Sequence, residues 1–182
     1  IAFYELANDT ARFKGFKSSI KRQPLQSFWV FTVEVGSAVR AKDRAKFSGW
    51  KDLAGKPVFT GPLPWDVRAQ LERAFSALGV KHNYRQVDLA AAGSLLQAGG
   101  IDSFIIYTNG EATTAPWITE ASLAADWAAL NPSADELAAL KKAGFAVTEV
   151  KPAAFRRDVH ADKVVLLPFY YGFHVGLEVP AD

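Results

Sequence analysis

Residues 58–80 of the 182-residue chain read VFTGPLPWDVRAQLERAFSALGV, and they carry the clearest signal of its fold class. A short apolar run from Val58 to Thr60 comes first, and a tight Gly-Pro loop follows it. From Trp65 to Leu78 the apolar residues then recur at the spacing of one helical face. Pro64 fits the first position of that helix, and Gly79 fits its stop. The stretch therefore predicts a strand, a loop and an amphipathic helix.

Two more strands and a second helix follow at regular spacing. The pattern predicts a strand over Asn83–Val87, a short helix over Leu89–Gln97 that Gly99 closes, and a strand over Ile101–Tyr107. Strand, helix, strand, helix, strand makes a βαβαβ unit, which implies a parallel sheet with helices on its faces. We therefore predict an α/β fold, a three-layer αβα lobe with a mixed, mostly parallel sheet.

The segments on either side carry further signals. Ser27–Ala41 alternates apolar and polar residues, which predicts a long strand with one buried face, and Gly36 within it indicates a bulge or a close backbone approach. Ser133 and Glu136 form a capping box, so a helix is expected from there to about Ala143. We also expect a helix over Ala115–Leu130, a helical turn over Pro152–Phe155, and strands over Ile1–Glu5, Phe145–Val150 and Lys163–Leu167.

The composition is that of an ordinary globular protein, with 49% hydrophobic and 22% charged residues and a net charge of +2. This low net charge, without long runs of like charge, argues against a nucleic-acid partner. The longest apolar stretches are far shorter than the ~20 residues that a membrane-spanning helix needs. Because the chain has no cysteine, it has no disulfide, no thiol nucleophile and no thiolate metal site.

The loop from Thr60 to Trp65 is the most informative candidate site, because it lies where a strand leads into a helix. In α/β sheets ligands bind at the carboxyl ends of strands, and the free N–H groups of a helix N-terminus favour an anion. Thr60 adds a hydroxyl, Gly61 and Pro62 form the turn, and Trp65 offers a ring that could cover a ligand. A plain Gly-Pro connection with Trp65 packed in the core explains the pattern equally well.

A second group of candidates ends the third strand of the unit. Tyr107, Thr108 and Asn109 should open on the same edge of the sheet as Gly61, so the two strand ends would face one cleft. Asn109-Gly110 is also an ordinary turn signal, which leaves a purely structural alternative open.

Aromatic and acidic residues outside the unit add further candidates. The run from Phe169 to His174, which includes Tyr171, is dense in rings that supply contact area and orienting hydroxyls in a cleft. Packing in the core or at an interface is the alternative. The polar turn after the first strand exposes Tyr4, Glu5 and Asn8. Glu34 is either a buried charge or solvent-facing, and we expect the latter.

The residues form no convincing catalytic constellation. The chain has no Gly-x-Ser-x-Gly nucleophile elbow, no phosphate loop and no dinucleotide-binding fingerprint. Its histidines are expected to have surface or structural roles rather than to bind a metal. We therefore expect no enzyme activity, no cofactor and no metal.

Several segments follow one another in a recognisable order. They are Phe31 to Arg40, Trp50-Lys-Asp-Leu-Ala-Gly-Lys56, Val58-Phe-Thr-Gly-Pro62, an amphipathic helix, Gly99-Gly-Ile-Asp-Ser-Phe104 and a following helix. This order resembles the type II periplasmic solute-binding proteins, and most of all the TAXI family that serves TRAP transporters. In that family a segment of the form Ser/Trp-x-Asp-Leu-x-Gly-Lys opens the second lobe, and Gly-x-Ile-Asp-Ala-Phe ends its βαβαβ unit. The resemblance is specific over residues 28–110 and looser over 1–10 and 145–180.

The resemblance implies a type II periplasmic-binding-protein fold, in which two lobes close around a ligand by hinge motion. Residues 1–56 would then hold part of the first lobe and a crossover strand, residues 57–150 the second lobe, and residues 151–182 a segment that returns toward the first lobe. It also implies roles for individual residues. Thr60, Gly61 and Trp65 would form an anion site with Tyr107 and Thr108 beside it, while Tyr4, Glu5 and Tyr171 would come from the first lobe and the returning segment.

The sequence departs from the family at Gly61-Pro-Leu-Pro-Trp65, where many members have a turn of small residues with more hydroxyl and amide donors. We therefore expect a larger or more aromatic ligand, and glutamate-like specificity is not assumed.

By this resemblance the protein is a periplasmic receptor that captures a small organic anion, a carboxylate, and delivers it to the membrane subunits of a TRAP transporter. It would act as a monomer and would not itself span the membrane. An accessory partner of a periplasmic enzyme, or an effector-sensing domain on the same fold, is the alternative. Family members are longer at both ends, so we expect the chain to be a central part of a longer protein, with the signal peptide outside it.

Overall fold

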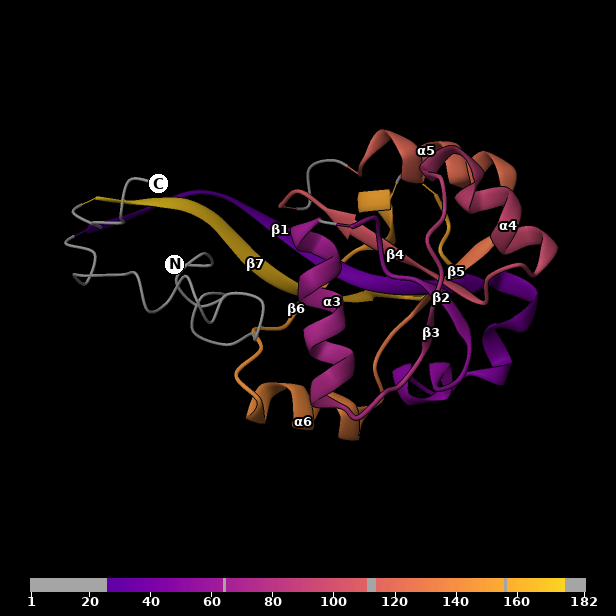
Figure 1. Cartoon of the computed structure of the whole chain (residues 1–182), viewed down its shortest axis with the longest axis horizontal. Helices are drawn as coiled ribbons and strands as arrows, with labels where there is room; N and C mark the ends of the chain where they lie inside the picture. Colours follow the sequence, from indigo (N-terminus) through magenta and orange to yellow (C-terminus); the bar gives the residue numbers. More distant parts are fainter. Residues whose placement is uncertain (1–25, 64, 111–113, 156, 176–182) are drawn as a thin grey trace. The chain divides into compact units, whose positions relative to one another are not determined.

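The computed structural model describes residues 26–63, 65–110, 114–155 and 157–175 (Figure 1). Residues 34–168 form one compact unit, and the described residues outside it, 26–33 and 169–175, belong to a second. The chain passes between the two units twice, once within each of two long strands.

The elements follow the α/β alternation that the sequence predicts. In chain order they are β1 (Gln26–Arg40), η2 (Ala41–Lys46), η3 (Trp50–Leu53), β2 (Pro57–Phe59), α3 (Asp66–Ala77), β3 (Asn83–Tyr84), η4 (Leu89–Ala91), α4 (Ala92–Ala98), β4 (Ser103–Thr108), α5 (Pro116–Ala124), β5 (Trp127–Leu130), α6 (Ala134–Lys142), β6 (Thr148–Val150), η5 (Pro152–Phe155) and β7 (Val164–Val175), where η marks a short 3-10 helix.

The strands form an open mixed sheet in the order β3-β2-β4-β1-β7-β6, with β5 also paired to β1. Strand β2 runs parallel to both β3 and β4, as the βαβαβ prediction requires. Strand β1 runs antiparallel to β4 and to β5, and β6 runs antiparallel to β7. The α/β class and the mixed sheet are confirmed, and the parallel pairing lies within the predicted unit.

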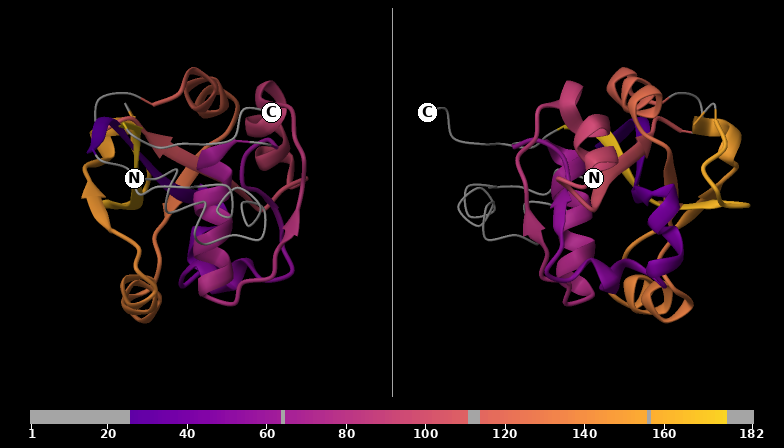
Figure 2. Two further views of the ribbon diagram at one scale, coloured as in Figure 1. Left: turned by 60° about the vertical axis from the view of Figure 1, so that its left-hand side comes forward. Right: turned by 90° about the vertical axis from the view of Figure 1, so that its right-hand side faces the viewer.

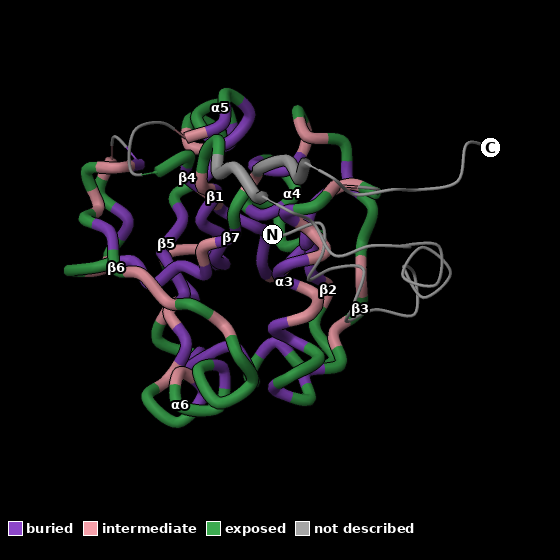
Figure 3. Tube along the Cα trace, turned by 90° about the vertical axis from the view of Figure 1, so that its left-hand side faces the viewer, coloured by how far each residue is buried: buried purple, intermediate pink, exposed green. Residues whose placement is uncertain are grey.

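Helices cover both faces of the sheet in the larger unit. Helices α4 and α5 lie together on one face, and α3 and α6 lie on the other (Figures 1 and 2). The strands between them are buried over most of their length (Figure 3). The close packing of α4 on α5 depends on Gly93, because a Cβ at that position would lie 2.6 Å from the carbonyl oxygen of Ala121.

Several local predictions are confirmed. The long strand β1 matches Ser27–Ala41 closely, and Gly36 does mark a close approach, because a Cβ there would lie 2.6 Å from Leu166 Cδ2. The capping box of Ser133 and Glu136 is present, and Gly79 follows α3 with a φ of 71°, in the left-handed region that favours glycine.

Glu136 also fastens a distant segment to the unit. Its carboxylate is buried and accepts hydrogen bonds from the backbone N–H groups of Ser133, Trp50 and Lys51, at 2.7, 2.9 and 2.6 Å. The Trp50 indole donates to the carbonyl oxygen of Leu130 at 2.7 Å. The start of the Trp50–Lys56 segment is thus held by α6 and β5.

The first helix of the unit matches its predicted range to within one residue, because it begins at Asp66 with Trp65 as its N-cap. A turn closed by the Trp65 N–H and the Pro62 carbonyl precedes it. The prediction for Pro64 lies outside the described residues. One local prediction is wrong. The helix predicted over Ala115–Leu130 ends at Ala124, and its last part is strand β5. Because β5 is buried along its whole length and pairs with β1, sheet pairing outweighs the helical propensity of its alanines.

The predicted strands also differ in length. β3 and β6 are shorter than the ranges 83–87 and 145–150, and β7 runs to Val175 rather than ending at Leu167.

Candidate functional site

The parallel pairing brings the two predicted strand ends to one edge of the sheet. The register sets Val58 of β2 opposite Ser103 of β4, and Phe59 opposite Phe104. Both strands therefore run in the same direction, and their carboxyl ends carry the loop after Thr60 and the Tyr107–Asn109 segment. In an α/β sheet this edge is where ligands bind.

Two of the predicted donors at this edge are already used inside the protein. Thr60 and Thr108 are both fully buried. Thr60 Oγ1 donates to Glu72 Oε1 at 2.5 Å, and Thr108 Oγ1 donates to Glu34 Oε2 at 2.6 Å. A hydroxyl has one hydrogen, so in this arrangement neither threonine has a proton left to donate to an anion.

The burial of Glu34 corrects the expectation that it faces solvent. Only 7% of Glu34 is exposed. Glu34 lies opposite Thr108 of the neighbouring strand β4 and accepts its hydrogen bond, so the polar side of the alternating pattern is buried here as well. An alternating pattern shows that the two faces of a strand differ in polarity. It does not show whether other parts of the protein bury both faces.

Thr60 contacts a charged network of Glu72, His82 and Arg68 that was not predicted from the sequence. Glu72 on α3 accepts hydrogen bonds from Thr60 and from His82 Nε2, the latter at 3.0 Å, and Arg68 Nη2 lies 3.4 Å from its Oε1 atom. Burial raises the pKa of Glu72, but the hydrogen bonds from His82 and Thr60 outweigh it and leave the pKa below its ordinary value. The only sequence signal for this network is the helical i,i+4 spacing of Arg68 and Glu72.

The turn after Thr60 is shaped by its neighbours on β3 and α3. Gly61 has a φ of 108°, which requires glycine, and its carbonyl accepts a hydrogen bond from the Tyr84 hydroxyl at 3.0 Å. The Arg68 guanidinium lies 4.3 Å from the centre of the Tyr84 ring. Pro62 and Trp65 are half-buried, so Trp65 does not pack fully into the core.

Tyr107 keeps its hydroxyl hydrogen, unlike Thr60 and Thr108. Its hydroxyl oxygen accepts a hydrogen bond from Trp117 Nε1 at 3.1 Å, and among the described residues it has no acceptor for its own hydrogen. Burial raises the pKa of the Tyr107 phenol, and the bond from Trp117 offsets part of that rise. The neighbouring Asn109 is exposed. Trp117 was not predicted as a site residue. It lies at the start of α5, and no sequence pattern relates it to Tyr107.

The remaining predicted residues lie elsewhere. Tyr171 belongs to the smaller unit, where its ring stacks on Phe31 at 4.6 Å between centroids and contacts Phe169 at 5.2 Å. Tyr4, Glu5 and Asn8 lie outside the described residues, so their predicted roles stay predictions.

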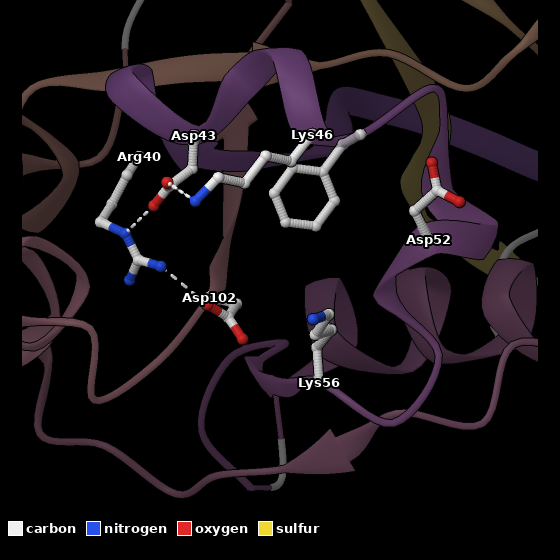
Figure 4. A pocket seen from close by; sticks show the side chains of 7 residues that line it. Arg40, Asp43, Lys46, Asp52, Lys56 and Asp102 are labelled. Atoms are coloured by element: carbon white, nitrogen blue, oxygen red, sulfur yellow. Dashed lines mark hydrogen bonds and ion pairs between the residues drawn. The ribbon is translucent and has the colours of Figure 1, made fainter.

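A pocket of about 140 Å³ lies at the other end of the parallel strands and contains none of the predicted residues (Figure 4). Its centre is Arg40, which donates to Asp43, to Asp102 at 2.8 Å and to the carbonyl oxygens of Leu96 and Ile101 at 3.0 and 2.9 Å. Figure 4 shows Asp43 between Arg40 and the ammonium group of Lys46. Because Arg40 bonds two carboxylates and two backbone carbonyl oxygens, it connects the end of β1 to the start of β4.

A larger depression of about 370 Å³ lies beside α5 and also excludes the predicted residues. Asp126 accepts hydrogen bonds there from Arg157 and His160, at 2.9 and 2.8 Å. Across the described ranges, no group of three or more His, Cys, Asp or Glu residues is arranged to hold a metal ion.

Comparison with known proteins does not show which family the chain belongs to. No family model matches it, and a search of curated proteins finds no significant match. Among the helices that the structure describes, none is both long and apolar enough to cross a membrane.

Proposed function

We propose that this protein is an extracytoplasmic solute-binding receptor, which captures a small organic anion between two lobes and delivers it to a TRAP-type membrane transporter. The site residues that we assign to it on the described edge are Tyr107 and Asn109 after β4, and Gly61, Pro62 and Trp65 after β2. Thr60 and Thr108 donate their hydrogens to Glu72 and Glu34, so we assign them a structural role at this edge and no direct bond to the ligand.

The observation that carries the ligand class is the unused hydroxyl hydrogen of Tyr107 at the carboxyl end of β4. A half-buried hydroxyl that donates to no described protein group can donate to a ligand that brings an acceptor. A carboxylate is the strongest common acceptor, because a hydrogen bond to a charged oxygen is roughly twice as strong as one between neutral groups. Arg68 lies beside the Gly61 turn, where its guanidinium is paired with Glu72.

The two-lobe part of the proposal rests on the path of the chain and on the family resemblance. Strands β1 and β7 each begin in one compact unit and end in the other. Two crossings of this kind are what a hinge between lobes requires, since a few residues in each strand can absorb the rotation. The Trp50–Phe104 segments that resemble the TAXI family supply the transport role.

A thermal-shift screen of carboxylates, followed by calorimetry, tests the ligand class. The set would contain aliphatic and aromatic mono- and dicarboxylates, with the matching amides as neutral controls. At 100 times its Kd a ligand stabilises the folded state by about 2.7 kcal/mol, which raises the Tm of a chain of this size by about 5–10 °C. If no carboxylate raises the Tm above its amide, the proposed function is wrong.

The transport role needs a separate measurement, because an accessory protein on the same fold would also bind a ligand. The protein is expected to co-purify with the membrane subunits of a TRAP transporter in a ligand-dependent manner. Stable association with a soluble enzyme in place of those subunits would favour the accessory role.

A further inference from the structure

Tyr107 and Trp117 form a pair at the carboxyl end of β4, in which the indole N–H points at the phenol oxygen. We propose that Trp117 is a positioning residue, which orients the Tyr107 hydroxyl so that its hydrogen is presented to a carboxylate oxygen of the ligand. This inference rests on the proposed function and deepens it, because it names the ligand group that the site recognises and the residue pair that recognises it.

The indole of Trp117 is itself held firmly. Only 7% of Trp117 is exposed. Its ring meets Phe59 of β2 and Phe104 of β4 in edge-to-face contacts, with centroids 6.2 and 5.9 Å apart, and both phenylalanines are fully buried. An aromatic ring that is packed on two sides cannot rotate to follow its partner. Trp117 is therefore the fixed member of the pair, and Tyr107 is the member that it orients.

The hydrogen bond decides which way the Tyr107 hydroxyl points. A phenol oxygen accepts through its lone pairs and donates through one hydrogen. The indole N–H is a donor only, so it takes a lone pair of the Tyr107 oxygen and excludes the phenol hydrogen from that direction. The hydrogen must then point elsewhere, and no described side chain receives it. The pair therefore holds a donor in place before the ligand arrives, which lowers the entropy lost on binding.

The two threonine hydroxyls at the same edge do not compete with Tyr107 for an acceptor on the ligand. Thr60 and Thr108 give their hydrogens to Glu72 and Glu34. A ligand with N–H donors in place of acceptors would leave the Tyr107 hydrogen without a partner, and that loss disfavours amines at this point. The Tyr107–Trp117 pair thus selects an oxygen acceptor.

The test uses Trp117→Phe, which keeps an aromatic ring and removes only the indole N–H and part of the ring. NMR of labelled tyrosine Cζ in the full chain reports on Tyr107, whose signal is the one missing in Tyr107→Phe. The N–H bond from Trp117 favours the phenolate, so Trp117→Phe is expected to raise the pKa of Tyr107 above its value in the unchanged chain. Trp127→Phe is the matched control, because the Trp127 N–H also bonds a hydroxyl, that of Ser122 at 2.9 Å, and does not touch Tyr107.

Binding is measured in the same samples with benzoate as the probe and benzamide as its neutral counterpart. Benzoate should shift the Tyr107 signal, and Tyr107→Phe should weaken its binding roughly tenfold or more, as expected for a hydrogen bond to a charged oxygen. Trp117→Phe should weaken it by roughly three- to tenfold, because the hydroxyl is then free to turn away. Trp127→Phe should leave it within about twofold of the unchanged chain.

Different failures point to different errors. If the pKa of Tyr107 is the same in Trp117→Phe and in the unchanged chain, Trp117 does not position the hydroxyl, whatever binds. If that pKa rises but benzoate binds equally well to the unchanged chain and to Tyr107→Phe, the hydroxyl does not serve the ligand, while the receptor proposal stands. If neither benzoate nor any carboxylate of the screen binds, the receptor proposal itself fails.

Should Trp117→Phe not fold, the reciprocal measurement decides. Tyr107→Phe removes the acceptor, and the indole N–H signal of Trp117 should then move upfield and exchange faster with solvent. An unmoved signal would overturn the pairing.

Discussion

Replacing Glu136 by glutamine should destabilise the protein strongly, although the change is isosteric. The carboxylate is only 2% exposed, and both of its oxygens are used. Oε2 accepts from the backbone N–H groups of Trp50 and Ser133, and Oε1 accepts from that of Lys51. All three donors are backbone groups, so they cannot turn toward another acceptor without moving the chain.

The magnitude follows from what glutamine can still do. With its carbonyl oxygen in the Oε2 position, glutamine keeps the bonds from Trp50 and Ser133 in neutral form, and its NH₂ group meets the Lys51 N–H donor to donor. A hydrogen bond to a charged group contributes about 1.5–3 kcal/mol, and a neutral one about 1 kcal/mol. The loss of one charged bond costs about 1.5–3 kcal/mol, and the weakening of the two others costs about 0.5–2 kcal/mol each. The total is about 2.5–7 kcal/mol in the free energy of unfolding, which lowers Tm by about 5 °C or more.

Urea denaturation followed by tryptophan fluorescence measures this change. Asp135→Asn is the matched control, because Asp135 is exposed in the same first turn of α6 and its change removes the same charge. That control should stay within about 0.5 kcal/mol of the unchanged chain. If Glu136→Gln lowers the free energy of unfolding no more than Asp135→Asn does, the Glu136 carboxylate does not hold Trp50 and Lys51 in place.

Three further predictions concern other parts of the structure. Gly93→Ala should cost about 3 kcal/mol in urea denaturation, because its Cβ would meet the backbone of Ala121, which cannot move aside, and a loss below about 1 kcal/mol would contradict the close helix packing. Asp43 should titrate at a pKa of about 2 by NMR, because Lys46 and Arg40 both donate to it. Since this pKa lies below its unfolded value, the stability that Asp43 adds is present above about pH 4 and is lost as the pH falls toward 2, and a titration near pH 4 would argue against the ion pairs. Arg40→Lys keeps the charge but not the fork of donors, so Tm should fall by about 5 °C, and an unchanged Tm would show that the fork of donors adds nothing.

The parts of the fold that follow from neighbouring residues are the parts that the sequence predicts well. The capping box of Ser133 and Glu136 and the helix stop at Gly79 depend on backbone groups within four positions, so the pattern contains all that is needed. The run Trp127–Leu130 reads as helix because its alanines favour one. It is a strand because β1, nearly ninety positions earlier, offers it pairing partners in a buried sheet, and nothing local reports that.

The candidate site divides along the same line. The residue pattern alone predicts that the Gly61 turn and the Tyr107–Asn109 segment follow two strands of one βαβαβ unit, and parallel strands must end at the same edge. Which hydroxyl at that edge keeps its hydrogen depends on long-range packing. The partners that settle it, Glu72, Glu34 and Trp117, lie 12, 74 and 10 positions from Thr60, Thr108 and Tyr107. A hydroxyl has a single hydrogen, and whether a neighbour takes it depends on a side chain that only the packed fold brings within reach.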